Sequence, residues 1–344
     1  MLTKPRRLRA GDRLAAVSLS WGGAGTFPHR YEAGKRQLEE AFGVEIVEMP
    51  HTLADAATLA AKPAARADDL HRAFADPDIA GVVSVIGGDD SIRLLPHLDL
   101  DLLAANPKVF LGYSDTTITQ MALLRAGVVS FYGPAIMAGF AENAGLHDYL
   151  VDGIRRTLFE PTAPLQWPEN RGGWTVEQRD WADPADQQQA RALQPPTGWR
   201  WHGGVVHEGP SLVGCLEVLD FLRGTAWWPS LEGVVLFLET SEDQPPPERL
   251  TYLLRTLALT GELERLAGLV FGRPGGANLP VEEHGRYDDA ILDVVRGEQG
   301  LHDLPVVTNV DFGHTDPIWT VPQGTRVRID PATRAITFCE TAVR

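Results

Sequence analysis

One serine stands where an apolar segment turns directly into a helical pattern. Residues 109–111 are apolar, Gly112-Tyr113-Ser114-Asp115 follows, and apolar residues then recur at helical spacing from Thr116 to Leu124. Open α/β sheets bind ligands at the carboxyl ends of their strands, and some hydrolases expose a nucleophilic serine on such a turn. The alternative is that Ser114 or Asp115 caps the start of the helix. Ser114 is therefore a candidate nucleophile whose assignment depends on the rest of the chain.

Glu239 and His314 are the two other residue types that a serine nucleophile needs. A serine hydroxyl reacts when a base lies within hydrogen-bonding reach and a carboxylate holds that base in one tautomer. Glu239 ends the apolar segment 234–238, and His314 follows the segment 306–310 and a short turn. A buried carboxylate usually has a partner, although Glu239 could also pair with Arg249 or cap the next turn. A lone histidine is more often structural, so only the three residues together predict this chemistry.

Two glycines, Gly87 and Gly88, follow the apolar segment 79–86. Backbone N–H groups at such a turn can face a developing oxyanion, but the same turn can bind phosphate or be no more than a tight turn. The chain has neither a GxGxxG nor a GxxxxGK[ST] pattern, which disfavours nucleotide-dependent enzymes. An oxyanion site beside Ser114 is one of the interpretations left open.

The elements that would position these residues alternate between strands and helices. In the first 150 residues we expect strands at 13–19, 44–48, 79–86, 109–114 and 128–132, and helices at 31–42, 54–75 and 116–124. After residue 210 we expect helices at 211–222, 247–260 and 282–296, strands at 233–239, 266–271 and 306–310, and a final strand pair with Pro331 at its turn. This alternation predicts an α/β fold, with an N-terminal parallel-sheet domain of flavodoxin or Rossmann type and a smaller C-terminal α/β domain.

The expected boundaries are 1–160 for the N-terminal domain that carries Ser114 and 210–344 for the C-terminal domain that carries Glu239 and His314. Between them, residues 161–209 form a linker and insertion rich in tryptophan and proline, with Trp167, Trp174, Trp181, Trp199 and Trp201. Five tryptophans in so polar a segment are expected to be largely covered. Most of them should pack at the seam between the domains, while one or two could form an apolar or stacking wall for a ligand.

The composition excludes several classes of function. The 344 residues carry a formal net charge of −15, which disfavours binding to nucleic acid polymers because these require a basic surface. The two cysteines, Cys215 and Cys339, have neither metal-ligand spacing nor a disulfide pattern, which suits a reducing compartment. No signal peptide and no apolar segment of about 18 residues is evident. We expect a cytoplasmic protein that does not bind membranes.

Taken in order, the motifs resemble those of the LD-carboxypeptidase family of serine peptidases. The matching segments are Gly11-Asp12-Arg13-Leu14, Ile86-Gly87-Gly88 with Arg93-Leu94-Leu95-Pro96, Gly112-Tyr113-Ser114-Asp115, Leu238-Glu239 and Phe312-Gly313-His314-Thr315. The resemblance spans residues 11 to 330, and the motifs keep the family's order of Ser, Glu and His. It covers nearly the whole chain, and chance production of the ordered set is implausible.

The resemblance implies a mechanism for these residues. Ser114 would attack a carbonyl carbon, His314 would take its proton and pass it to the leaving group, and Glu239 would orient His314. The backbone N–H groups of Gly88 and Asp115 would form the oxyanion hole. The resemblance further implies a homodimer that needs no metal and no organic cofactor.

Within the family, segments 86–96 and 112–117 and the insertion are similar to the branch that hydrolyses aminoacyl-nucleotide antibiotics of the microcin C type. This similarity implies that Gly87, Asp89 and Trp181 bind substrate, with Trp181 stacking on a nucleobase. The alternatives are a murein tetrapeptide LD-carboxypeptidase that releases terminal D-alanine, and a ligand-binding protein without turnover. At Gly214-Cys215-Leu216-Glu217 the family commonly has a Gly-Gly-Asn-like turn, so a ligand-facing asparagine is missing here.

Overall fold

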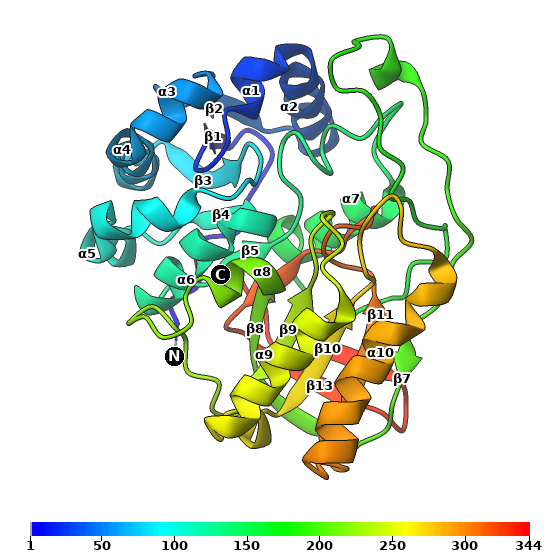
Figure 1. The fold of residues 1–344 in the computed structure, drawn as a ribbon. Coiled ribbons are helices and arrows are strands. Elements are labelled where there is room, and N and C mark those ends of the chain that lie inside the picture. The colour runs from blue at the N-terminus through cyan, green and yellow to red at the C-terminus, as the bar shows by residue number, and fades with distance from the viewer. Residues whose placement is uncertain (1) are drawn as a thin grey trace.

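Five strands from the first half of the chain and β12 from near its C-terminus form a six-stranded sheet in the order β12-β5-β4-β3-β1-β2 (Figure 1). The computed structural model describes residues 2–344. The strands are β1 (Arg13–Val17), β2 (Glu45–Glu48), β3 (Ile79–Ser84), β4 (Val109–Gly112), β5 (Ser130–Tyr132) and β12 (Val321–Gln323). The first five are parallel, and β12 runs antiparallel to β5. The expectation of a parallel N-terminal sheet is therefore confirmed.

Helices surround this sheet because the connections between parallel strands must cross its faces. They are α1 (Gly23–Thr26), α2 (Pro28–Phe42), α3 (Ala56–Ala61), α4 (Pro63–Ala75), α5 (Leu100–Ala105), α6 (Thr117–Arg125) and α7 (Asp148–Ile154). The expected helix at 54–75 is divided at Pro63, which starts α4 as its first residue, a position that proline tolerates well. Within residues 2–344, none of the helices combines the length and the apolar character needed to cross a bilayer.

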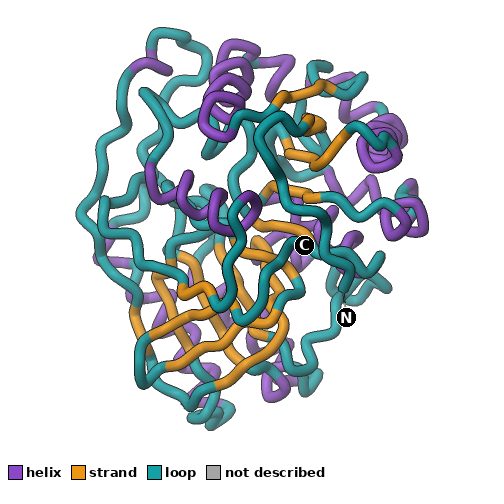
Figure 2. The backbone as a smooth tube through the Cα atoms, turned by 180° about the vertical axis from the view of Figure 1, so that it is seen from behind, coloured by secondary structure: helices purple, strands orange, loops and turns teal. Residues whose placement is uncertain are grey.

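A second sheet of eight strands occupies the other half, in the order β6-β14-β13-β8-β9-β10-β11-β7. Its strands are β6 (Leu165–Gln166), β7 (Arg200–Trp201), β8 (His207–Cys215), β9 (Val235–Glu239), β10 (Gly268–Gly272), β11 (Val306–Val310), β13 (Arg326–Asp330) and β14 (Ala335–Phe338). Strands β8 to β11 are parallel and the outer ones are antiparallel. Helices α8 (Leu216–Asp220), α9 (Pro247–Leu259) and α10 (Gly285–Leu292) complete this half, and Figure 2 shows its strands in front of the helices when seen from behind.

The expected helix at 211–222 is wrong. Residues 207–215 form β8, and only residues 216–220 are helical. The apolar spacing of this segment matches a helix, but β8 lies between β13 and β9, where both faces are covered, and a strand buried on both faces reads as a continuous apolar run. The register pairs Cys215 with Glu239, so β8 ends beside the predicted catalytic glutamate.

The insertion ties the two halves together. Its tryptophans Trp167 and Trp199 pack in one cluster with Tyr132 of the first sheet and Phe237 of the second. Both are under 10% exposed, and Trp201 packs against the same cluster, so three of the five tryptophans lie at the seam. The insertion also supplies β6 and β7 to the edges of the second sheet.

Candidate active site

Ser114 lies in a strained turn between β4 and α6. It begins a short 3₁₀ turn, and its φ of 63° is in the left-handed region, which costs a residue with a Cβ about 1–3 kcal/mol. Its backbone N–H donates to the hydroxyl of Tyr132 at 3.1 Å. A Cβ on Gly87 would lie 2.9 Å from both Cβ and Oγ of Ser114, so the Gly87 backbone can approach this serine only without a side chain. The predicted strand–turn–helix arrangement is present.

Glu239 and His314 are bonded to one another. Oε2 of Glu239 lies 2.7 Å from Nδ1 of His314, and the Glu239 side chain is fully buried. Tyr132 donates its hydroxyl to the other carboxylate oxygen. Burial, followed by the charge of Glu239, holds the pKa of Tyr132 well above its usual range, so the phenol stays protonated and remains a donor. The alternative partner Arg249 instead contacts Asp220, at 3.4 Å.

Gly313 leaves the space in which this pair forms. Its φ is 94°, and a Cβ there would lie 2.5 Å from Oε2 of Glu239 and 2.7 Å from its Cβ. An added methyl group would push the carboxylate away from Nδ1 of His314. The loop between β11 and His314 is therefore shaped to let Glu239 reach the imidazole.

Gly313→Ala is expected to lower kcat by about 10²-fold, because small displacements of catalytic groups have effects of this size. The measurement is steady-state hydrolysis, with circular dichroism to show that the variant folds. Gly300→Ala is the matched control, since Gly300 also has a positive φ, 64°, but nothing lies within 4 Å of the added Cβ. Equal losses in the two variants would show that backbone strain, and not displacement of Glu239, is responsible.

The other ring nitrogen of His314 faces an acid. Nε2 lies 3.2 Å from Oε2 of Glu242. Burial alone would lower the pKa of His314, but the carboxylates of Glu239 and Glu242 raise it to about 9. The imidazole is therefore protonated at neutral pH in this arrangement, and within residues 2–344 no hydrogen bond joins it to Oγ of Ser114. His314 can accept the serine proton only after Nε2 leaves Glu242.

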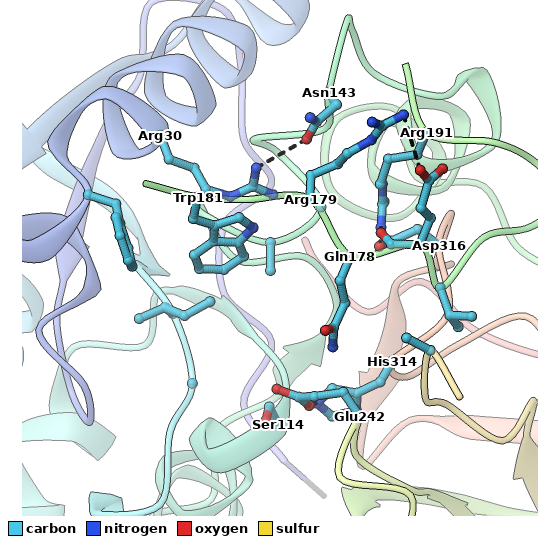
Figure 3. A pocket seen from close by; sticks show the side chains of 18 of the residues that line it. Arg30, Ser114, Asn143, Gln178, Arg179, Trp181, Arg191, Glu242, His314 and Asp316 are labelled. Carbon is cyan, nitrogen blue, oxygen red and sulfur yellow. Dashed lines mark hydrogen bonds and ion pairs between the residues drawn. The ribbon is translucent and has the colours of Figure 1, made fainter. Parts of the chain in front are cut away.

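Ser114 and His314 line one cavity of about 450 Å³. Figure 3 shows Ser114, His314 and Glu242 at one end of it, and Arg30, Trp181 and Asn143 at the other. Gly87 and Gly88 also line the cavity.

Of the two predicted oxyanion donors, Asp115 directly follows the serine and Gly88 lines the same cavity. The N–H of Asp115 is in the first turn of a helix, where backbone donors have no intrahelical partner, and a Cβ on Gly87 would lie 3.4 Å from it. The buried Asp115 carboxylate accepts from the N–H of Ser91 at 2.8 Å, which connects the two turns. Asp89, predicted to bind substrate, is exposed and does not line the cavity.

Trp181 forms part of the wall at the end of the cavity remote from Ser114. The guanidinium carbon of Arg30 lies 4.2 Å from its ring centroid, and Phe27 meets the indole edge-on with ring centroids 6.1 Å apart. The insertion that carries Trp181 is joined to the segment after His314, because Thr175 and Asp316 exchange two backbone hydrogen bonds of 2.7 and 3.0 Å. The structure thus brings the insertion and the predicted catalytic residues to one site.

Three contributors were missed in the sequence. Tyr132 is the last residue of a predicted strand and precedes Gly133-Pro134. Glu239 was located as a polar residue at the end of an apolar strand, and the same reasoning could have located Tyr132. Glu242 is three residues after Glu239 and could have been included by proximity. Arg30 lies in α2 with no motif around it, and no sequence signal points to it.

Cys215 lies near the pair although its sequence spacing gave no hint of this. One ligand atom each from Cys215, Glu239 and His314 lie within 4.8 Å of one another. The thiol contacts Oε2 of Glu217 at 3.4 Å, and burial followed by the charges of Glu239 and Glu217 holds its pKa well above the usual range. A protonated thiol is a poor metal ligand, and the Glu239 and His314 atoms already bond to one another.

Comparison with known families agrees with this geometry. Residues 14–133 match the LD-carboxypeptidase N-terminal domain, and residues 208–329 match the LD-carboxypeptidase C-terminal domain. The chain belongs to the LD-carboxypeptidase family. As a member of that family it is a serine-type carboxypeptidase or hydrolase. The resemblance drawn from the motifs is confirmed.

The names of two relatives of this family member point to different substrates. The microcin C7 self-immunity protein MccF of Escherichia coli is 29% identical over 282 residues, which are 80% of this chain and 78% of MccF. A probable murein peptide carboxypeptidase of Bacillus subtilis is 24% identical, and the match covers 96% of this chain and 92% of that protein.

Solved structures of family members have the same fold. An MccF-like protein from Streptococcus pneumoniae, in complex with AMP, has a TM-score of 0.84 at 30% identity, covering 95% of this chain and 98% of that one. MccF in complex with aspartyl sulfamoyl adenosine has a TM-score of 0.86 at 25% identity, covering 99% and 100%. The predicted two-domain α/β fold and the place near the MccF branch are confirmed.

Proposed function

We propose that Ser114, His314 and Glu239 form the catalytic triad of a serine peptidase. Oγ of Ser114 attacks the acyl carbon while Nε2 of His314 takes its proton. His314 then passes this proton to the leaving nitrogen as the carbon–nitrogen bond breaks. Water, deprotonated by His314, releases the acyl group from Ser114 and restores the hydroxyl. The bonded Glu239–His314 pair and the strained turn at Ser114 support these roles.

The oxyanion of each tetrahedral intermediate is placed between the N–H groups of Gly88 and Asp115. Asp115 directly follows Ser114, and Gly88 lines the same cavity; donors fixed before the reaction stabilise developing charge without reorganising. Glu239 stabilises the imidazolium that forms when His314 holds the serine proton. Tyr132 positions Glu239 through one oxygen and leaves the other for Nδ1 of His314.

The substrate we propose is an aminoacyl-nucleotide or peptidyl-nucleotide antibiotic of the microcin C type, cleaved at an amide-type bond as a detoxification. The observation that carries this choice is the wall formed by Trp181 and Arg30 across the cavity from Ser114. An indole can stack on a nucleobase, and a guanidinium binds phosphate or sulfamate oxygens. The AMP complex of the Streptococcus pneumoniae relative and the aspartyl sulfamoyl adenosine complex of MccF support the same choice.

Trp181→Ala tests the nucleotide part of the proposal. Loss of stacking on one base costs about 1–3 kcal/mol, so KM for an alanyl sulfamoyl adenosine should rise about 10-fold or more, with a smaller change in kcat. Trp227→Ala is the control, because Trp227 lies outside this cavity and stacks under Arg125. An unchanged KM in Trp181→Ala would remove the nucleobase from this wall.

The second candidate function is release of D-alanine from murein tetrapeptides, which the relative in Bacillus subtilis favours by its name. The triad chemistry would be identical, but no base would stack on Trp181. A ligand-binding role without turnover ranks below both. The homodimer and the cytoplasmic location implied by the resemblance and composition stay predictions.

A further inference from the structure

Glu242 lines the cavity next to His314, the predicted catalytic base. Its carboxylate contacts Nε2 of His314 and has no lysine or arginine within ion-pair distance in the described part of the chain, residues 2–344. Its side chain is 58% exposed. By contrast, Asp316 on the same wall is paired with Arg191 at 2.7 Å. Glu242 is therefore an available carboxylate at the Ser114 end of the cavity.

The proposed reaction must break the Glu242–His314 contact. His314 needs Nε2 to accept the proton of Ser114, so Glu242 loses this ionic partner at the moment when substrate is bound. A carboxylate left in this position beside the buried Glu239 would be repelled by like charge. A cation brought by the substrate would restore a partner for Glu242 and would free Nε2 in the same event.

The remote end of the cavity contains a cation, Arg30, for which no ion pair is found among residues 2–344. Arg30 donates to the backbone oxygen of Met137 at 2.9 Å and to the side-chain oxygens of Asn143 and Gln187 at 3.1 and 3.0 Å, all of them neutral groups. Burial, followed by the charge of Arg191, lowers its pKa to about 10, so the guanidinium stays charged at neutral pH. The cavity thus presents a cation at the Trp181 end and an anion at the Ser114 end.

We propose that Glu242 selects substrates whose acyl part carries a cation, an ammonium or a guanidinium, next to the bond that is cleaved. This rests on the proposed function and names the substrate class within it. The anionic nucleotide-like part lies toward Arg30, and the cationic acyl part lies toward Glu242. The same cation has two chemical sources, the α-ammonium of an aminoacyl group or the side chain of a lysyl or arginyl group.

The test is binding to Ser114→Ala, which cannot turn substrate over, measured by calorimetry. The probes are four sulfamoyl adenosines whose acyl groups are alanyl, N-acetylalanyl, N-acetyl-lysyl and N-acetylglutamyl. Alanyl carries only the α-ammonium, N-acetyl-lysyl only the side-chain ammonium, N-acetylalanyl neither, and N-acetylglutamyl an anion. One or both cationic probes should bind about 10-fold tighter than the N-acetylalanyl probe, as expected for a charge-assisted hydrogen bond. The probe that binds tighter shows whether the cation is the α-ammonium or the side-chain ammonium.

Ser114→Ala/Glu242→Gln should erase that preference, and Ser114→Ala/Asp243→Asn should retain it. Asp243 is exposed, follows Glu242 in the chain and does not line the cavity. Asp243→Asn therefore removes the same charge as Glu242→Gln from a position outside the cavity. Equal affinities for all four probes in Ser114→Ala, tighter binding of the anionic probe, or a preference that survives Glu242→Gln would each overturn the proposal. Because these are affinities, they hold whether or not the wild type hydrolyses the compounds, which is tested separately.

The pH profile gives a second readout that a merely structural role of Glu242 would not move. Glu239, Glu242 and Glu217 raise the pKa of His314, while the Tyr113 ring packs against it at 4.9 Å and the protonated Cys215 thiol lies nearby. His314 must be neutral to act as a base, so kcat/KM should rise with pH toward about 9. Glu242→Gln should move this rise to lower pH, and an unmoved profile would contradict the contact.

Discussion

Ser114→Ala is expected to abolish hydrolysis by roughly 10⁴- to 10⁶-fold in kcat, because the members of a catalytic triad act as a unit. The substitution removes Oγ, the atom that forms the acyl bond, and leaves Glu239, His314 and Tyr132 in contact. Among the described residues 2–344 it removes no buried hydrogen bond, since the bond from this residue to Tyr132 is made by the backbone N–H. Substrate should therefore still bind, with a dissociation constant within a few-fold of the wild-type KM.

The measurement is single-turnover hydrolysis together with calorimetric binding. Ser230→Ala is the control, because Ser230 is exposed and remote from the cavity. If Ser114→Ala retained wild-type turnover, or if the wild type acylated no substrate while still binding ligand, the chain would be a binding protein and not an enzyme that uses this serine.

Glu239→Gln is expected to lower kcat about 10²- to 10⁴-fold, less than Ser114→Ala, by analogy with neutralised triad carboxylates. The amide keeps the shape of the side chain but loses the charge that stabilises the His314 imidazolium. Its NH₂ group can also face Nδ1, which would hold the imidazole in the wrong tautomer. Because Glu239 raises the pKa of His314, that pKa should fall in the variant.

Both consequences are measurable, kcat by steady-state kinetics and the pKa of His314 by NMR titration. Glu248→Gln provides the comparison, since Glu248 lies on the exposed side of α9 with its side chain 57% exposed. Wild-type turnover in Glu239→Gln would remove this residue from the mechanism, even if Ser114→Ala were inactive.

Much of the fold could be predicted because most strands of the first sheet are short apolar runs followed by a glycine or a polar turn. The same property located Ser114, Glu239 and His314, since parallel strands deliver their carboxyl ends to one edge. The segment 211–222 could not be predicted in this way. Its apolar spacing fits a helix, and it forms a strand because it pairs with β13 on one side and β9 on the other.

The walls of the cavity were harder to predict than its catalytic centre. Trp181 was expected to contact substrate and does line the cavity, but its partner Arg30 comes from α2, about 150 residues earlier in the chain. Arg191 and Asp316 likewise meet only through tertiary structure. Asp89 shows the opposite case, because a residue next to the Gly87-Gly88 turn need not face the site. Contacts between distant segments carry no local sequence signal.

The substrate class is decided by hydrolysis of two substrates, side by side, by the purified wild-type protein. One is an alanyl sulfamoyl adenosine and the other is a murein tetrapeptide that ends in D-alanine. We expect release of alanine and sulfamoyl adenosine, lost in Ser114→Ala, with little or no release of D-alanine from the tetrapeptide. Release of D-alanine alone would contradict this expectation, and would leave Trp181 and Arg30 as a structural wall in a cell-wall peptidase.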